Sequence, residues 1–174
     1  FGSLSARAIE SLNRGCKLAH AYHNCGEGGL SPYHKKGADV IYQVGTGYFG
    51  VRDDHGNFSM EKMIALVEAN PEIKAIEIKL SQGAKPGKGG VLPASKITKE
   101  ISEIRHVPMG KDVISPATHT AFDGVEGLID FVEQIAEATG LPVGIKAAIG
   151  KLQDWEKLAQ LMVKTNKGPD FIQV

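Results

Sequence analysis

Several features that would assign a protein to a specialised class are scarce in this sequence. Only two cysteines, Cys16 and Cys25, occur among the 174 residues, which is too few for a disulfide framework and favours a reducing, cytoplasmic environment. An excess of positive charge is missing, since 20 lysine and arginine residues balance 20 aspartate and glutamate residues. This balance argues against nucleic acid as a partner. No apolar run approaches the roughly 18 residues that a membrane helix needs, so we predict no membrane segment.

Sequence patterns of a signal peptide or a metal site are scarce too. The first residues, Phe1–Ser5, contain neither a basic stretch nor an apolar stretch, so they do not form a signal peptide. Because the chain does not start with methionine, we interpret it as a piece from inside a longer protein. The histidines show neither an H-E-x-x-H pattern nor paired cysteines nearby, and we therefore predict no metal site.

What the sequence does contain is an alternation of short apolar runs and amphipathic segments. Apolar residues make up 42% and charged residues 23%, the balance of an ordinary globular domain. Runs of the kind found in buried parallel strands predict strands at 20–24, 40–44, 75–80, 112–115, 142–147 and 170–174. Helices are predicted between them, with Gly140 just after a helix end and with N-caps at Ser5, Ser59, Thr98 and Asp154.

Repeated strand–helix units build a parallel sheet covered by helices. The units average about 30 residues, the spacing of a (β/α)8 barrel of roughly 250 residues, so this α/β chain would hold about six of the eight units. A doubly wound open sheet fits the alternation equally well, but it needs a G-x-G-x-x-G turn after its first strand, which the sequence lacks. We therefore predict an incomplete TIM barrel with parallel strands over residues 1–174. Its two open edges predict self-association.

Polar residues and glycines gather after the predicted strands, where barrel enzymes carry their chemistry. The run Asn24-Cys25-Gly26-Glu27-Gly28-Gly29 follows the first strand, and its Glu27 is a candidate acid, base or hydrogen-bond partner. The alternative is a solvated turn in which the glutamate is incidental. Three spaced glycines in 45–50 follow the second strand, but without a Lys-Ser/Thr pair they indicate a tight turn.

The segment 79–90 combines three lysines with several glycines and is longer than an ordinary βα loop. Lys79 lies at the strand end, where burial of its ammonium group requires a charged partner. Together with Lys85 it could neutralise carboxylate or phosphate oxygens, so the segment is either an anion site or a solvated basic loop. Lys146 presents a similar choice in the fifth strand. It is either a cation near a reduced flavin ring or a surface lysine.

Two of these pieces, Gly26-Glu27-Gly28-Gly29 and Gln82-Gly83-Ala84-Lys85-Pro86-Gly87 with Gly89-Gly90, form a specific combination. Further pieces are Phe1-Gly2-Ser3 with Ser5, Asn24, Gln43-Val44 with Gly47 and Phe49-Gly50, Glu77-Ile78-Lys79, Ile104-Arg105, Ile114-Ser115-Pro116 with His119, and Ile145-Lys146. In this order, from the first residue to the last, the sequence resembles the FMN-binding barrel domain of the glutamate synthase family.

The resemblance implies an oxidoreductase that forms L-glutamate. In this family 2-oxoglutarate and ammonia form 2-iminoglutarate, which receives a hydride from reduced FMN. Glu27 and Lys85 would lie beside the iminating carbon and assist proton transfers. The resemblance also implies a set of substrate-binding residues, with one cation for each carboxylate: Lys79 and Arg105, together with Gln82. The residues implied to contact FMN are Ser3, Asn24, Gln43 and Lys146.

The sequence also departs from this family's pattern. Val91 stands where the larger synthases tend to carry a glutamine beside the substrate. The iron–sulfur cysteines and the glutaminase domain are not matched, so a cluster, and an electron-donor protein or NAD(P)H-oxidising subunit, would belong to the parent protein. The glycine-rich segment that binds the FMN phosphate should follow residues 171–174. We therefore expect this chain by itself to bind FMN weakly or not at all.

Two other functions stay open at this point. A related barrel subunit is a transferase that makes N-methylglutamate from glutamate and methylamine, and one sequence does not separate the two reactions. A catalytically silent domain with an assembly or regulatory role is the third interpretation.

Overall fold

The structure is a computed structural model that describes residues 1–82 and 89–174. The helices in this part of the chain are α1 (Ala6–Leu18), α2 (Met60–Ala69), α3 (Lys99–Arg105), α4 (Gly124–Thr139) and α5 (Leu152–Thr165), with short 3-10 turns η1 (Pro32–His34) and η2 (Ala94–Lys96). The strands are β1 (His23–Asn24), β2 (Val40–Val44), β3 (Ile73–Lys79), β4 (Val91–Leu92), β5 (Val113–Ile114), β6 (Val143–Lys146) and β7 (Ile172–Gln173). None of these helices is long and apolar enough to cross a bilayer.

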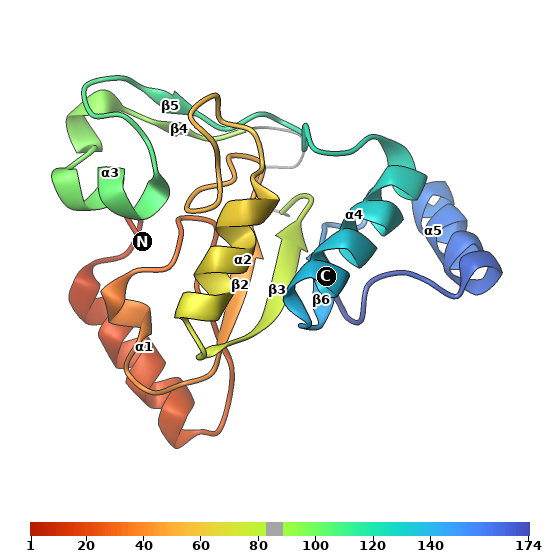
Figure 1. Cartoon of the computed structure of the whole chain (residues 1–174), viewed down its shortest axis with the longest axis horizontal. Helices are drawn as coiled ribbons and strands as arrows, with labels where there is room; N and C mark the ends of the chain where they lie inside the picture. Colours follow the sequence, from red (N-terminus) through yellow and green to blue (C-terminus); the bar gives the residue numbers. More distant parts are fainter. Residues whose placement is uncertain (83–88) are drawn as a thin grey trace.

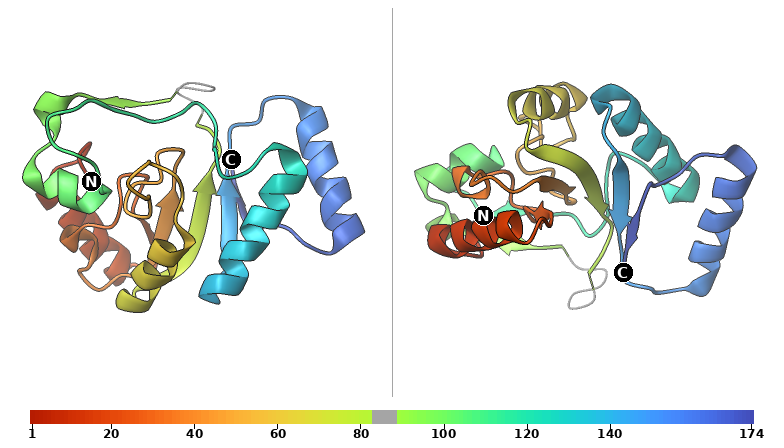
Figure 2. Two further views of the ribbon diagram at one scale, coloured as in Figure 1. Left: turned by 45° about the horizontal axis from the view of Figure 1, so that its top comes forward. Right: turned by 90° about the horizontal axis from the view of Figure 1, so that it is seen from below.

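Five of the described strands form one parallel sheet in the order β1-β2-β3-β6-β7. The sheet is curved, and α2, α4 and α5 lie along its outer side (Figure 2). A curved parallel sheet with helices outside it is part of a (β/α)8 barrel. The predicted incomplete TIM barrel, which we call the half-barrel, is therefore confirmed.

The predicted strand at 112–115 does not belong to this sheet. Its central residues form β5, which pairs antiparallel with β4 in a separate two-stranded sheet on the side of the molecule away from α5 (Figure 1). The parallel sheet thus has five strands in the described chain, one fewer than expected. Val113 is buried, as in a barrel strand, but it packs with Phe49 and Ile101 in a second, smaller core. A short apolar run does not specify which element covers it.

The parallel sheet has two chemically different faces, because successive side chains of a strand point to opposite sides. One face, which we call the helix face, carries Val44, Ile76, Ile78 and Ile145, each at most 1% exposed. These side chains pack with those of α2, α4 and α5 in the main core. The opposite, concave face, which we call the inner face, carries the polar residues of the same strands: Gln43, Glu77, Lys79 and Lys146.

Most of the predicted helix ends are confirmed. Ser5, Ser59 and Thr98 each accept a hydrogen bond from a backbone N–H in the first turn of the helix that follows. Gly140 ends α4 with φ at 68°, a conformation that glycine adopts easily. The N-cap prediction for Asp154 is wrong, because α5 begins two residues earlier. A carboxylate inside the first turn still interacts favourably with the helix dipole, which explains the misleading signal.

Candidate active site

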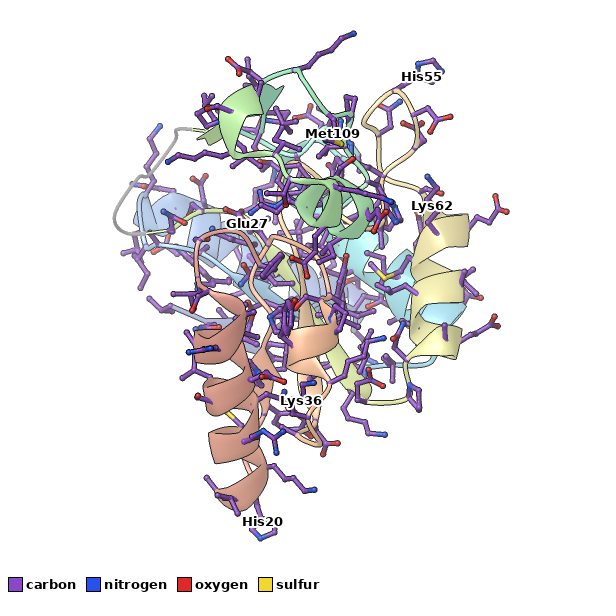
Figure 3. The ribbon with its side chains drawn as sticks, turned by 90° about the vertical axis from the view of Figure 1, so that its left-hand side faces the viewer. His20, Glu27, Lys36, His55, Lys62 and Met109 are labelled. Carbon is purple, nitrogen blue, oxygen red and sulfur yellow. The ribbon has the colours of Figure 1, made fainter. Side chains whose placement is uncertain are left out.

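The carboxyl ends of β1, β2 and β3 border two cavities at one end of the molecule. The larger cavity has a volume of about 740 Å³ and lies between β1, α1 and the β4–β5 sheet. The smaller cavity, of about 90 Å³, lies at the end of β3. Glu27, Gly90 and Ser115 line both of them. Figure 3 shows Glu27 in this region, whereas His20 lies at the opposite end of the molecule.

An ion pair joins Lys79 to Glu27 where the two cavities meet. The Lys79 ammonium group lies 3.1 Å from Glu27 Oε2, and the lysine side chain is only 12% exposed. The expectation that a lysine at this strand end needs a charged partner is confirmed. Glu27 keeps 44% of its side chain exposed, so one side of the pair remains open to a ligand. An anion that enters here meets a desolvated cation, for which electrostatic attraction is stronger than in water.

Glycines allow Glu27 to reach this position. The backbone turns after β1 at Gly26, whose φ is 70° and whose N–H donates to the Asn24 side-chain oxygen over 2.9 Å. Gly45, at the end of β2, lies directly against the glutamate: a Cβ atom there would be 2.6 Å from Glu27 Oε2. The first of the spaced glycines that follow β2 therefore does more than close a tight turn, because it leaves room for the carboxylate.

A buried carboxylate on the inner face, Glu77, connects two of the predicted cofactor residues. Its Oε1 accepts a hydrogen bond from Asn24 Nδ2 over 2.8 Å and another from Gln43 Nε2 over 2.6 Å. The side chain is fully buried, and its Oε2 has no hydrogen-bond partner among the residues described. Our sequence analysis assigned no role to Glu77. Its position two residues before Lys79 was the available signal, because both then lie on one face of the strand.

Arg105 lies at the end of α3 and lines the larger cavity together with Asn24 and Glu27. Its guanidinium donates from Nε and Nη2 to the Phe1 carbonyl oxygen, over 3.3 and 2.7 Å, and lies 4.9 Å from the centre of the Phe49 ring. Burial lowers the pKa of this guanidinium, and the nearby Glu27 carboxylate partly offsets that effect. The backbone of Phe1 and the ring of Phe49 thus hold the Arg105 side chain at the wall of the larger cavity.

The remaining predicted site residues that the structure describes lie around the same region. Gln82 lines the smaller cavity with Lys79, and Ser3 lines the larger one. Lys146 is the register partner of Lys79 across β3 and β6, so both lysines lie on the inner face. Lys85 lies outside the described residues. Val91 forms part of the wall of the larger cavity.

Buried histidines form the end of the larger cavity beside α1. Asn13 bridges them: its Nδ2 lies 3.0 Å from His23 Nδ1 and donates to the His34 carbonyl oxygen over 2.6 Å. Burial lowers the pKa of His34 to about 4 and also lowers that of His23, so both imidazoles are neutral at pH 7. The thiol of Cys25 lines the cavity as well, and burial raises its pKa to about 11. This thiol is therefore not a nucleophile at neutral pH.

The charged groups of the site suit the binding of an anion beside a proton-transfer group. Lys79 and Arg105 supply positive charge near Glu27: Lys79 forms an ion pair with it, and the charge of Glu27 acts on the Arg105 guanidinium. No group of three His, Cys, Asp or Glu residues that could hold a metal ion occurs in residues 1–82 and 89–174. The chemistry that these residues support is therefore the binding of a carboxylate or phosphate and the transfer of protons at Glu27.

Comparisons with known proteins point to one family. A family model described as the conserved region in glutamate synthase matches residues 1–174. The glutamate synthase large subunit-like protein YerD of Bacillus subtilis is 42% identical over 176 residues, covering 100% of this chain and 33% of that protein. An archaeal-type glutamate synthase (NADPH) of Thermotoga sp. (strain RQ2) is 41% identical over 151 residues, covering 85% of this chain and 27% of that protein.

A third relative is an archaeal glutamate synthase (NADPH) of Methanocaldococcus jannaschii. It is 40% identical over 151 residues, covering 85% of this chain and 27% of that protein. The chain thus spans about a third or less of the length of these curated relatives.

Proposed function

The chain belongs to the glutamate synthase family, and from this premise we propose that its half-barrel carries the glutamate-forming site of an oxidoreductase. The proposed substrates are 2-oxoglutarate and ammonia, and the proposed product is L-glutamate. The observation that carries the proposal is the Lys79–Glu27 ion pair between the two cavities, with Arg105 on the wall of the larger one. This arrangement offers two cations to a ligand with two carboxylates.

Glu27 is the proposed proton-transfer group. Carbon–nitrogen bond formation between ammonia and the ketone carbon requires removal of a proton from nitrogen and delivery of a proton to the departing hydroxyl group. The Glu27 carboxylate can carry both protons in turn: the first passes from the ammonia nitrogen to the former ketone oxygen and gives a hydroxyl group, and the second passes from the same nitrogen to that hydroxyl, which leaves as water. Lys79 beside Glu27 binds a substrate carboxylate and brings the ketone next to this acid–base group. The resulting imine carbon is then ready to accept a hydride.

FMN, when bound, supplies that hydride. Two observations support a flavin at this site. The larger cavity has a volume of about 740 Å³, within the range of small-molecule sites. The inner face also holds the Asn24–Glu77–Gln43 network, in which a buried carboxylate fixes the orientation of two amides. In our proposal these amides and Ser3 contact the flavin ring, and the ammonium group of Lys146 stabilises negative charge on it.

The electron source and the location of the protein are further parts of the proposal. Two of the relatives carry NADPH in their names, so we propose NADPH as the ultimate electron source, which reaches the flavin through another domain or subunit. The two cysteines of the chain are free thiols, which supports a reducing, cytoplasmic environment.

The test uses the full-length protein that contains this chain. We expect the purified protein to carry flavin and to form glutamate from 2-oxoglutarate and ammonia with a chemical reductant. Glu27→Gln should lower kcat by about 100-fold or more, because general acid–base catalysis contributes on that scale. Glu61→Gln, an exposed carboxylate on α2, is the matched control and should leave kcat unchanged.

Three outcomes would contradict this function. A full-length protein without flavin would overturn the oxidoreductase. Formation of N-methylglutamate from glutamate and methylamine, without glutamate formation, would support the transferase instead. Binding of flavin without turnover of either substrate pair would support a silent domain.

A further inference from the structure

A buried histidine that the proposed chemistry does not use, His119, lies behind the Lys79–Glu27 pair. It belongs to the segment between β5 and α4 and is 8% exposed. Its Nε2 atom lies 2.9 Å from the Lys79 carbonyl oxygen, and its Nδ1 atom lies 3.2 Å from the hydroxyl oxygen of Tyr48. His119 therefore touches the residue that supplies the cation of the site, through its backbone.

The partners of His119 specify its tautomer from both sides. A carbonyl oxygen can only accept, so the Nε2 atom that faces Lys79 carries the hydrogen. The Tyr48 hydroxyl oxygen accepts hydrogen bonds from the backbone N–H groups of Thr120, over 2.9 Å, and Ala121, over 3.0 Å. With both of its acceptor positions used, the hydroxyl donates its own hydrogen to His119 Nδ1. Both arguments give the neutral Nε2–H form.

This hydrogen-bond chain connects three segments that are far apart in the sequence. Tyr48 is fully buried in the turn after β2, and its φ of 50° is unusual for a residue with a side chain. Lys79 ends β3, and His119 precedes α4 and stacks on Phe122 with 5.1 Å between ring centres. A side chain that bridges these segments restrains the end of β3 relative to its neighbours.

We propose that His119 is a positioning residue: its neutral imidazole, held by Tyr48, holds the Lys79 carbonyl and so keeps the Lys79 ammonium group against Glu27. The proposal concerns the geometry of the chain itself, and it rests on the proposed function only where ligand affinity is concerned. Lys79 would otherwise be free to turn its long side chain toward solvent, because flexible lysines are held in place only by their surroundings.

Protonation would break this arrangement. A hydrogen on Nδ1 would point at the Tyr48 oxygen, which has no acceptor position left. Two contacts favour the protonated form of His119: its hydrogen bond to the Lys79 carbonyl oxygen and the charge of Glu27. Burial outweighs both and lowers the pKa of His119 below its usual range. The stabilisation from neutral His119 is therefore complete above about pH 6.5 and decreases as the pH falls below that value.

The first test requires no substitution and no ligand. Nitrogen-15 NMR of the histidine rings in the full-length protein should show His119 as the neutral Nε2–H tautomer at pH 7, and its pKa should lie below the usual value for a histidine. The exposed His55 provides an internal reference in the same spectra. A proton on Nδ1, or protonation of His119 with a pKa near 6.5, would overturn the proposal whether or not the protein makes glutamate.

The second test compares two substitutions. His119→Phe keeps an aromatic ring against Phe122 but removes both hydrogen bonds, whereas His119→Gln keeps one donor and one acceptor. We expect acetic anhydride to modify Lys79 about tenfold faster in His119→Phe, as followed by mass spectrometry, and close to the wild-type rate in His119→Gln. His55→Phe is the matched surface control. Equal Lys79 modification rates in wild-type protein and folded His119→Phe would contradict the positioning role.

Ligand affinity completes the test. His119→Phe should weaken 2-oxoglutarate binding about tenfold in the wild-type background and should have no further effect in Lys79→Met, because both changes remove the same interaction. An equal loss in both backgrounds would mean that His119 acts without Lys79, against the proposal. If the wild-type protein does not bind 2-oxoglutarate at all, the proposed function is wrong, while the NMR and modification results still decide the role of His119.

Discussion

The helix face and the inner face of the parallel sheet are built from the same strands, yet they differ in almost every property. On the helix face, Ile76 and Ile78 are fully buried among apolar side chains of the helices. On the inner face of the same strand, Glu77 is equally buried but is surrounded by amides, and Lys79 pairs with Glu27. The residues alternate one by one along β3.

This difference separates stability from function. Apolar burial supplies most of the free energy of folding and requires only a suitable shape, so the helix face stabilises the half-barrel. Buried polar groups require partners in defined positions, and an unpaired one is unfavourable. The inner face carries Glu77, whose Oε2 has no hydrogen-bond partner in residues 1–82 and 89–174, so it stabilises the fold less than an apolar face would, and we infer that it serves ligand binding. Four predictions test this division, in order of decreasing effect on stability.

The largest loss of stability is expected on the helix face. Ile76→Ala removes a fully buried side chain from the centre of the main core, where close packing prevents collapse of the cavity. We expect the free energy of unfolding to fall by about 2–5 kcal/mol in urea denaturation. Lys74→Ala, at an exposed position earlier in the same strand, is the control and should change it by less than about 0.5 kcal/mol. Similar effects at both positions would refute the assignment of the core to this face.

Acid should lower the stability of the folded state by protonating a buried histidine, whereas it leaves the apolar core unchanged. His34 is 1% exposed and neutral, with a pKa lowered to about 4 by burial, so the folded state resists its protonation. The stabilisation it provides is complete above about pH 6.5 and is lost as the pH falls toward 4, by roughly 2–3 kcal/mol in total. Urea denaturation of wild-type protein and His34→Gln between pH 7 and 4 measures this. Parallel pH curves for the two proteins would contradict the buried neutral histidine.

Removal of the inner-face carboxylate should have a smaller effect on stability. Glu77→Ala leaves the amide groups of Asn24 and Gln43 without their acceptor, which costs about 1–3 kcal/mol. Glu77→Gln retains one acceptor oxygen and should cost less. Chemical denaturation measures both variants, and flavin binding to the full-length protein should decrease in both. If Glu77→Ala destabilises the chain as strongly as Ile76→Ala, the two faces do not divide stability from function.

The smallest effect on stability, combined with a clear effect on the site, is expected at Gly45. In Gly45→Ala the new methyl group would lie 2.6 Å from Glu27 Oε2 and 2.8 Å from Glu27 Cβ, so the whole Glu27 side chain would have to shift away from Lys79. We expect 2-oxoglutarate affinity to fall about tenfold while the free energy of unfolding changes by less than about 1 kcal/mol. Gly15→Ala is the matched control, because nothing lies within 4 Å of that position, and in a helix it should stabilise slightly. Unchanged affinity in Gly45→Ala would argue against Glu27 as part of the ligand site.

Most local signals in the sequence were sufficient for prediction. The caps at Ser5, Ser59 and Thr98 are contacts within a few residues, and they were predicted correctly, whereas Asp154 lies inside the first turn of α5 instead of capping it. The need of Lys79 for a charged partner follows from a lysine at the end of an apolar strand, and Glu27 meets that need. The run 112–115 was misassigned, because only its distant neighbours distinguish a strand of the small β4–β5 sheet from a barrel strand.

The order of residues alone thus specifies the half-barrel and its family, because a repeated strand–helix period and a succession of short motifs are properties of the chain itself. The role of Glu77 and of His119 arises only on folding. The partners of both, Asn24, Gln43, Tyr48 and Lys79, lie 34 to 71 residues away along the chain. The role of a buried polar group depends on the hydrogen-bond donors and acceptors that surround it, and only folding brings those groups within hydrogen-bond distance.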